Sequence, residues 1–223
     1  MVECGCLREP LSPEACAALA DIPVAAMARL GRYVELLHRW QMAMNLVSAR
    51  SLADPWRRHI LDSAQLLPLL PSRTRVLVDL GSGSGFPGLV LAMLGVPEVH
   101  LIESDGRKCV FLAEAARAGG LEPGRNPIIH RARIEALEGW PADAITARAC
   151  APLDRLLDYA AKFVTPATEC LFLKGENVGS ELTEAEKQWK MRIERHASRS
   201  DPSGIVLRLR HIERATSRTN RIP

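Results

Sequence analysis

The chain has 223 residues, enough for one domain or a domain with an appendage but too few for two full enzyme domains. With 47% apolar and 25% charged residues, its composition is that of an ordinary globular protein, which excludes disorder over most of the length. The formal net charge of +3 is too small to indicate a nucleic-acid-binding protein by itself.

The basic excess lies near the C-terminal end. Residues 176–223 carry 10 basic and 7 acidic side chains, whereas residues 75–175 carry 11 and 12. The arginines that recur there, with only Glu213 to oppose them, are Arg208, Arg210, Arg214, Arg218 and Arg221. We expect residues 214–223 to be a flexible basic tail; a phosphate-contacting patch is the alternative, because the planar guanidinium suits phosphate.

The cysteines indicate a reducing compartment. Six are present, but they form no C-x-x-C pair, and no histidine cluster has the spacing of metal ligands, so neither a disulfide framework nor a metal site is predicted. The N-terminus lacks the apolar segment of a secretory signal, and no apolar run is long enough to span a membrane. We expect a cytoplasmic protein without a membrane or metal partner.

Residues 12–71 are predicted to be helical. Ser12 followed by Pro13 suits an N-cap and the first helical residue. The next helix has apolar residues at three-and-four spacing, which predicts one buried stripe formed by Val24, Met27, Leu30, Val34 and Leu37. No strand is expected before residue 75, so residues 1–74 are assigned to an N-terminal helical extension.

From residue 75 the pattern changes to short apolar runs separated by helix-length segments. The runs lie at 76–80, 99–103, 127–130, 143–147 and 169–173. Strands that alternate with helices form βαβ units and a parallel sheet, which predicts a Rossmann-like α/β domain over residues 75–213. Residues 181–190 are expected to be a charged helix, and residues 205–212 a half-exposed strand.

A glycine loop follows the first predicted strand. Gly81, Gly83 and Gly85 stand at alternate positions, where glycine lets the backbone turn tightly and approach a ligand. Glu103 ends the next predicted strand, at a place where a carboxylate can accept hydrogen bonds from both hydroxyls of a ribose. Together these residues predict a site for an adenosine-containing ligand.

Two cofactors fit this loop. Gly83, Gly85 and Gly88 formally satisfy the dinucleotide fingerprint of NAD-binding proteins, but Pro87 removes an N–H that a pyrophosphate would use. Asp79, two residues before Gly81, suits a cationic amino-acid portion instead. We therefore favour S-adenosylmethionine, with NAD and a purely structural glycine turn as alternatives.

Several motifs together resemble the ribosomal small subunit methyltransferase G family, also called glucose-inhibited division protein B. In the extension they are Trp40-Gln41, Asn45-Leu46-Val47-Ser48 and Arg58-His59-Ile60-Leu61-Asp62-Ser63. In the α/β region they are the glycine loop with Phe86-Pro87-Gly88, Glu103-Ser104, Arg107-Lys108, Phe111-Leu112, Ala147-Arg148-Ala149 and Leu173-Lys174-Gly175. The resemblance spans roughly residues 30–175 and is more specific than any single motif.

The resemblance implies a class I methyltransferase fold, whose seven-stranded sheet ends in an antiparallel hairpin. It implies transfer of a methyl group from S-adenosylmethionine to N7 of one guanine of 16S rRNA near the decoding site, so that the partner is 16S rRNA or the small ribosomal subunit. Carried over by motif, the cofactor-binding residues are Gly81, Gly83, Gly85, Phe86, Glu103, Ile134, Glu135 and Arg148. Ile134 and Glu135 flank the adenine in this assignment, Arg148 lies at the methyl-donor side, and Lys174 faces the RNA.

Three of these side chains have alternative roles. Arg148 could hold a phosphate or the guanine O6, or form a salt bridge to Asp154 or another surface acid. Lys174 could be a structural or solvated strand-end lysine. His59 is expected to be a structural histidine paired with Asp62 or Asp79, with RNA contact as its second role.

No catalytic acid or base is predicted. Guanine N7 carries an in-plane lone pair and no proton, so attack on a sulfonium methyl requires placement alone. A glycine loop reports the cofactor and not the acceptor, so a methyltransferase acting on a small molecule or protein is the first alternative. An NAD-binding oxidoreductase and a non-catalytic nucleotide-sensing module are the others.

Overall fold

Seven strands form one sheet in the computed structural model, which describes residues 9–215. The strand order is β3-β2-β1-β4-β5-β7-β6. The first five strands are parallel, β7 is antiparallel to β5, and β6 is antiparallel to β7. The strands are β1 (Val76–Leu80), β2 (Glu98–Glu103), β3 (Ile128–Arg131), β4 (Ala144–Arg148), β5 (Glu169–Lys174), β6 (Trp189–Ala197) and β7 (Ile205–Arg214). The predicted class I methyltransferase architecture is confirmed.

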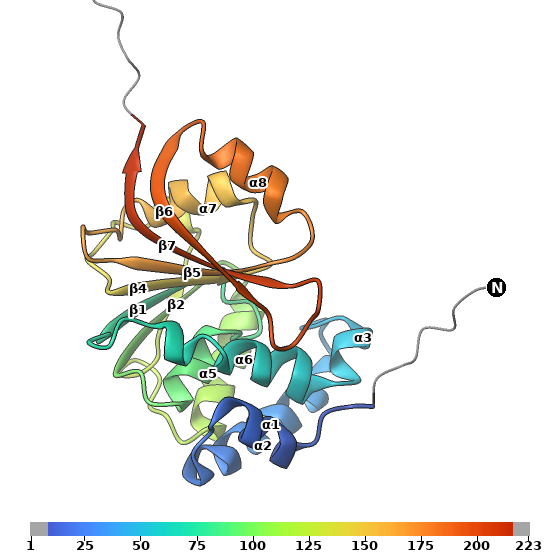
Figure 1. The fold of residues 1–223 in the computed structure, drawn as a ribbon. Coiled ribbons are helices and arrows are strands. Elements are labelled where there is room, and N and C mark those ends of the chain that lie inside the picture. Colours follow the sequence, from blue (N-terminus) through green and yellow to red (C-terminus); the bar gives the residue numbers. More distant parts are fainter. Residues whose placement is uncertain (1–8, 216–223) are drawn as a thin grey trace, which may run out of the picture.

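Helices cover both faces of this sheet (Figure 1). Before β1 lie α1 (Pro13–Ala20), α2 (Val24–Gln41), α3 (Ala49–Leu52), the π-helical turn η1 (Trp56–Leu61), α4 (Asp62–Ala64) and the 3-10 turn η2 (Leu67–Leu69). After it lie α5 (Gly88–Met93), α6 (Gly106–Ala118), the 3-10 turn η3 (Ile134–Ala136), α7 (Leu153–Ala160) and α8 (Val178–Ala185). None of the helices within residues 9–215 combines the length and apolar character needed to cross a bilayer.

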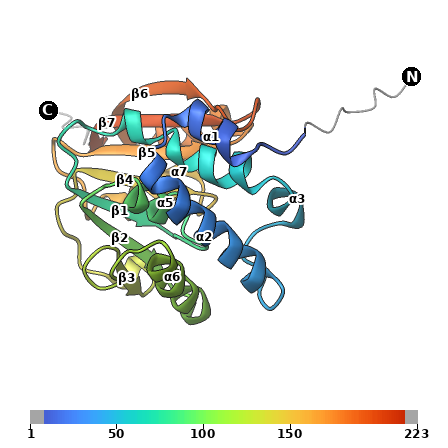
Figure 2. The ribbon, with the colours of Figure 1, turned by 90° about the horizontal axis from the view of Figure 1, so that it is seen from below.

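Alternate residues of each central strand face two different cores. Leu77 packs into the core that α1, α2, α5 and α6 share, whereas Val78 packs into the core beneath α7 and α8. Seen from below, α2 lies along the same side as α5 and α6, and it contacts both (Figure 2). The strands are therefore buried on both faces, as their continuous apolar runs predicted.

The N-terminal helices agree with the predicted extension except at one residue. Ser12 accepts a hydrogen bond from the amide of Ala15, and Pro13 begins α1. The predicted stripe on α2 is buried at Leu30, Val34 and Leu37, but Val24 is 89% exposed. Val24 is the first residue of the helix, and Ala26 faces the core in that turn instead.

The C-terminal region differs more from its predicted pattern. The helix expected over 181–190 ends at Ala185, and Trp189 begins β6, an edge strand that the sequence reading missed. Four of the nine residues of β6 are charged, as is common in edge strands, and so β6 lacks the apolar signature of a strand. The strand expected over 205–212 is confirmed as β7.

Three arginines of the predicted basic end lie in β7 and are ion-paired. Arg208 contacts Glu169 at 2.5 Å, Arg210 contacts Glu194, and Arg214 contacts Asp158 at 2.5 Å. They belong to the sheet, and Arg214 is its last residue rather than the start of a tail. The remainder of the predicted flexible tail, 216–223, lies outside the described residues, and the division into 1–74, 75–213 and 214–223 stays a prediction.

Candidate active site

A cavity of about 770 Å³ opens at the carboxyl ends of the parallel strands. It lies where the order of the sheet reverses between β1 and β4, the usual ligand position in open α/β sheets. Its walls come from the β1–α5 loop, the ends of β2, β4 and β5, residues 46–51 and 58–62 of the extension, and the β6–β7 turn. The volume suits a ligand the size of a nucleoside cofactor.

The glycine loop has the backbone conformation that its sequence predicted. Gly81, Gly83 and Gly85 have φ of 66°, 56° and 94°, in the left-handed region that side chains disfavour. A Cβ on Gly81 would lie 2.5 Å from Sγ of Cys150, and one on Gly85 would lie 2.8 Å from the hydroxyl oxygen of Tyr33. Torsion angle therefore favours glycine at all three positions, and space requires it at Gly81 and Gly85.

Tyr33, which the sequence reading did not single out, supports this loop from α2. It is fully buried, and its hydroxyl donates a hydrogen bond to the carbonyl of Ser84. Burial raises the pKa of Tyr33 well above its usual value, so the phenol stays neutral and can donate. The helical extension thus contributes directly to the shape of the loop.

Glu103 ties the loop to the end of β2. Its Oε2 accepts from the amide of Gly83 at 2.9 Å, and its Oε1 accepts from the amide of Asp105 at 2.8 Å. The side chain lines the cavity, and each oxygen keeps a further lone pair that a ribose hydroxyl could use. The predicted ribose contact is compatible with this geometry and stays a prediction.

Asp79 differs from its predicted role as a direct partner of a cationic ligand. The carboxyl is fully buried beneath the loop, where Oδ1 accepts from the hydroxyl of Thr146 at 2.7 Å and Oδ2 has no hydrogen-bond partner among residues 9–215. Burial raises its pKa to about 6, against the opposing effect of the Thr146 hydrogen bond. Asp79 can act on a ligand only through its field, because it does not line the cavity.

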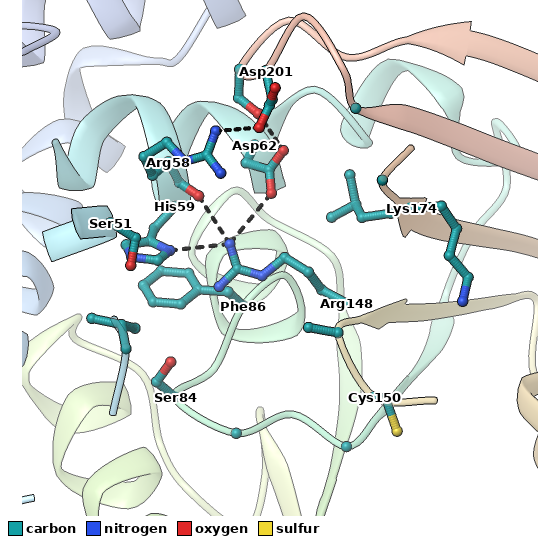
Figure 3. Close-up of a pocket in the computed structure, with 18 of the residues that line it drawn as sticks. Ser51, Arg58, His59, Asp62, Ser84, Phe86, Arg148, Cys150, Lys174 and Asp201 are labelled. Atoms are coloured by element: carbon teal, nitrogen blue, oxygen red, sulfur yellow. Dashed lines mark hydrogen bonds and ion pairs between the residues drawn. The ribbon is translucent and has the colours of Figure 1, made fainter. Parts of the chain in front are cut away.

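Phe86, His59 and Arg148 form a stack beside the loop (Figure 3). The rings of His59 and Phe86 are stacked with centroids 4.6 Å apart, and the guanidinium carbon of Arg148 lies 4.9 Å from the Phe86 centroid. Burial, aided by the charges of Arg148 and Arg58, lowers the pKa of His59 to about 3. His59 is therefore a neutral histidine, and its partner is Arg148 rather than the predicted Asp62 or Asp79.

Arg148 is held by the extension. Its Nη1 lies 3.1 Å from Nδ1 of His59, donates to the carbonyl of Arg58 at 3.0 Å, and forms an ion pair with Asp62 at 3.3 Å. Of the acids considered for a salt bridge, Asp154 or another, the partner is therefore another acid, Asp62. Asp62 is 86 residues away in sequence, so local spacing gave no signal for this pair.

Lys174 lines the cavity, but its ammonium is engaged by protein groups. Its Nζ contacts Oε2 of Glu181 at 2.6 Å and donates to the carbonyl of Ala151 at 2.8 Å, and the side chain is 8% exposed. Glu181 also accepts from the amide of Leu153. Contact between Lys174 and RNA, as predicted, requires this ion pair to open or to be shared.

The structure brings most, but not all, of the predicted site residues together. The predicted residues around the cavity are His59, Gly81, Gly83, Phe86, Glu103, Arg148 and Lys174. Gly85 shapes the loop behind the lining, and the lining does not include Ile134 or Glu135. These two lie in η3, where Lys162 donates to both carbonyls at 3.0 and 3.1 Å, so their predicted place beside an adenine stays a prediction.

Comparison with known proteins gives consistent matches. The model of the family described as rRNA small subunit methyltransferase G (GidB) matches residues 26–202. The ribosomal RNA small subunit methyltransferase G of Rhodospirillum rubrum is 56% identical over 207 residues, which cover 92% of this chain and all of that protein. The protein of the same name from Paramagnetospirillum magneticum is 46% identical over 205 residues, covering 92% and 98%.

A solved structure confirms the fold at much lower identity. The O-methyltransferase from Bacillus cereus, in complex with SAH, has a TM-score of 0.56 at 12% identity and covers 80% of this chain and 90% of its own. The family matches confirm the motif resemblance and the predicted reaction class, S-adenosylmethionine-dependent methyl transfer, over the oxidoreductase and nucleotide-sensing alternatives. The chain belongs to the rRNA small subunit methyltransferase G family.

Proposed function

We propose that this chain transfers a methyl group from S-adenosylmethionine to N7 of one guanine of 16S rRNA, in the cytoplasm where small ribosomal subunits are made. One observation carries the proposal. In a member of this family, a single cavity joins a left-handed glycine loop on one side to a half-buried, pre-positioned arginine on the other (Figure 3). The first side suits the cofactor, and the second suits an acceptor base.

The residues around the loop fit the cofactor. The space beside Gly83 is open, since the nearest atom to the position of a Cβ there lies 3.9 Å away, and Glu103 stands at the adjacent strand end with free lone pairs. Gly81, Gly83 and Glu103 would hold the nucleoside, and the buried charge of Asp79 beneath the loop favours a cation. When bound, S-adenosylmethionine supplies an electrophilic methyl group.

The side chains at the cavity suit a reaction that needs no general base. His59 is 4% exposed and its Nδ1 faces the guanidinium of Arg148, so it is not available to take a proton. Guanine N7 has no proton to lose, so the contribution of the protein is alignment. Holding two reactants in line accounts for about 7–11 kcal/mol in favourable intramolecular reactions.

Arg148 is the residue we assign to the acceptor. Its charge is permanent, and a guanidinium edge donates well to an oxygen acceptor such as the guanine O6 or a phosphate. Adenine carries an amino group in place of O6 and cannot accept there. Arg148 therefore favours guanine over adenine in the cavity.

Two measurements test the proposal. Calorimetry should show binding of S-adenosylhomocysteine and none of NAD. Labelled methyl from S-adenosylmethionine should then appear as N7-methylguanine in 16S rRNA, with small subunits from a strain lacking the gene as acceptor. Binding of NAD alone, or label confined to protein or small molecules, would refute the proposal.

A further inference from the structure

Three segments that are distant in sequence meet at Arg148. The η1 turn and the start of α4 supply Arg58, His59 and Asp62, β4 supplies Arg148 itself, and the β6–β7 turn lies on the far side of Asp62 (Figure 3). All three segments line the cavity. The three segments are joined to one another by hydrogen bonds and ion pairs.

Among residues 9–215, the hydrogen bonds and the ion pair of the Arg148 guanidinium all involve one nitrogen, Nη1. Nη1 faces the Arg58 carbonyl, the His59 ring and the Asp62 carboxylate, at 3.0 to 3.3 Å. Within residues 9–215, Nε and Nη2 have no hydrogen-bond acceptor, and neither atom is buried. Because Phe86 lies against the guanidinium, the group is fixed in orientation with its free edge available to a ligand.

Asp62 joins this arginine to the β6–β7 turn. Its Oδ2 is the carboxylate atom that Arg148 contacts, and its Oδ1 accepts from the hydroxyl of Ser200 and from Nε2 of Gln65. The Asp62 side chain is 15% exposed, so both oxygens are largely shielded from solvent. One half-buried carboxylate thus bridges an arginine at the end of β4 and a serine in the turn.

Two further contacts run in parallel with this bridge. Arg58 forms an ion pair with Asp201 of the turn at 2.6 Å, and Oε1 of Gln65 accepts from the amide of Arg199 at 2.8 Å. The guanidinium groups of Arg58 and Arg148 therefore each have their own aspartate. Loss of Asp62 would leave the charge of Arg148 without its carboxylate, next to the carbonyl and ring that remain.

We propose that Asp62 is a positioning residue for methyl transfer. It sets the free edge of Arg148 toward the acceptor and couples that orientation to the β6–β7 turn. The inference rests on the proposed function, in which Arg148 contacts the guanine. It extends that function by making the N-terminal extension and the hairpin turn two parts of one acceptor site.

The test uses Asp62→Asn, which keeps the shape of the side chain and removes its charge. We expect single-turnover methylation of small subunits to slow at least tenfold, while the Kd for S-adenosylhomocysteine stays within twofold, because Asp62 faces the acceptor side. Ser200→Ala, which removes only the far end of the bridge, should slow the reaction less. Unchanged methylation in Asp62→Asn, or an equal loss of cofactor binding, would overturn the proposal.

Asp54→Asn is the matched control. Asp54 forms an ion pair with Arg57 at 2.7 Å in the same extension, but it does not line the cavity. Its substitution should leave the methylation rate within twofold. A loss equal to that of Asp62→Asn would show that the extension is needed for folding only, and would contradict the positioning role.

A double-mutant cycle separates positioning from general destabilisation. If Asp62 acts through Arg148, Asp62→Asn should add less than a twofold loss in the Arg148→Lys background. If the rate loss of the double variant equals the product of the two single-variant losses, the inference is contradicted.

Hydrogen exchange distinguishes failure of this inference from failure of the proposed function. If wild-type protein does not methylate small subunits, the proposed function fails, and the bridge is judged by exchange of the amides of 198–204. Those amides should exchange faster in Asp62→Asn and Ser200→Ala than in wild type or Asp54→Asn. Equal exchange in all four proteins would overturn the bridge itself.

Discussion

At the scale of single residues, burial decides what each polar group at the cavity can do. His59 is neutral because its charged form would lose hydration beside Arg148. Asp79 shows the opposite case, a buried acid whose pKa is raised to about 6. Neither group is placed to exchange protons with a substrate, which agrees with a reaction that requires only alignment.

The loop glycines give a prediction about cofactor binding. Gly81→Ala should weaken binding of S-adenosylhomocysteine at least tenfold, because its Cβ would meet Cys150 at 2.5 Å and displace the loop. Gly120→Ala is the control: φ is 70° there and 66° at Gly81, but nothing lies within 4 Å of its Cβ. Both variants should lose about 1–2 kcal/mol of stability from the torsion alone. Equal cofactor affinity in the two would contradict a role for the loop backbone.

Asp79 predicts an unusual dependence of stability on pH. The folded state binds the proton more tightly than the unfolded state, whose pKa is near 3.8, so the free energy of unfolding should fall as pH rises from about 4 to 6. The change attributable to this group is about 3 kcal/mol. Urea denaturation of wild type and Asp79→Asn measures it as a difference, in which His59 and other groups cancel. A difference that does not vary between pH 4 and 7 would contradict the assignment.

Lys174 gives a prediction about the acceptor side. Lys174→Ala should reduce RNA methylation and leave the Kd for S-adenosylhomocysteine within twofold. The substitution removes the ion-pair partner of Glu181 at the cavity, and the unpaired carboxylate then repels RNA phosphates. Lys187→Ala is the control, since Lys187 also pairs with a glutamate but is exposed and away from the cavity. Equal loss of methylation and cofactor affinity would exclude an RNA-side role for Lys174.

At the scale of elements, the N-terminal helices are part of the site. α2 supports the glycine loop through Tyr33, and η1 and α4 hold Arg148. π-helical turns such as η1 are frequent at functional sites. The extension therefore positions groups on both sides of the cavity.

Tyr33→Phe tests the contact between α2 and the loop. Loss of the hydroxyl leaves the buried Ser84 carbonyl without this donor, and should cost about 1–3 kcal/mol of unfolding free energy and weaken cofactor binding. Tyr159→Phe, which removes an exposed hydrogen bond to Glu135, is the control for stability and should cost less. If both substitutions lower the unfolding free energy equally, the hydrogen bond from Tyr33 to the loop does not contribute more than an exposed one.

The sequence predicted elements better than it predicted partners. Five parallel strands were predicted from local apolar runs, because the central strands β1, β2, β4 and β5 are buried on both faces along most of their length. β3 was predicted although it is a half-exposed edge strand, because it begins with two isoleucines. β6 was not predicted, because an exposed edge strand carries charged residues. Val24 was wrongly predicted to be buried, because helical periodicity does not show which turns of a helix lie outside the core. The Asp62–Arg148 pair and the Tyr33–Ser84 bond depend on tertiary contacts, for which neighbouring residues give no pattern.

At the scale of the whole molecule, the charge distribution differs from its first interpretation. The C-terminal arginines that make much of the +3 excess are partly used inside the sheet, where Arg208 and Arg210 pair with Glu169 and Glu194. Residues 75–175 are near neutral, and three of the cations that line the cavity, Arg58, Arg148 and Lys174, each have a carboxylate partner. The fourth, Lys108, forms no ion pair within residues 9–215. This arrangement suits a protein that recognises a folded ribosomal substrate by a few local contacts.

The central claim is that this chain methylates N7 of one guanine in 16S rRNA. The most direct test is mass-spectrometric mapping of 16S rRNA from a strain that lacks the gene, and from the same strain carrying wild-type or Gly81→Ala protein. The account predicts that one N7-methylguanine is absent without the gene, restored by the wild type, and not restored by the variant. An unchanged N7-methylguanine content in the strain without the gene would contradict it.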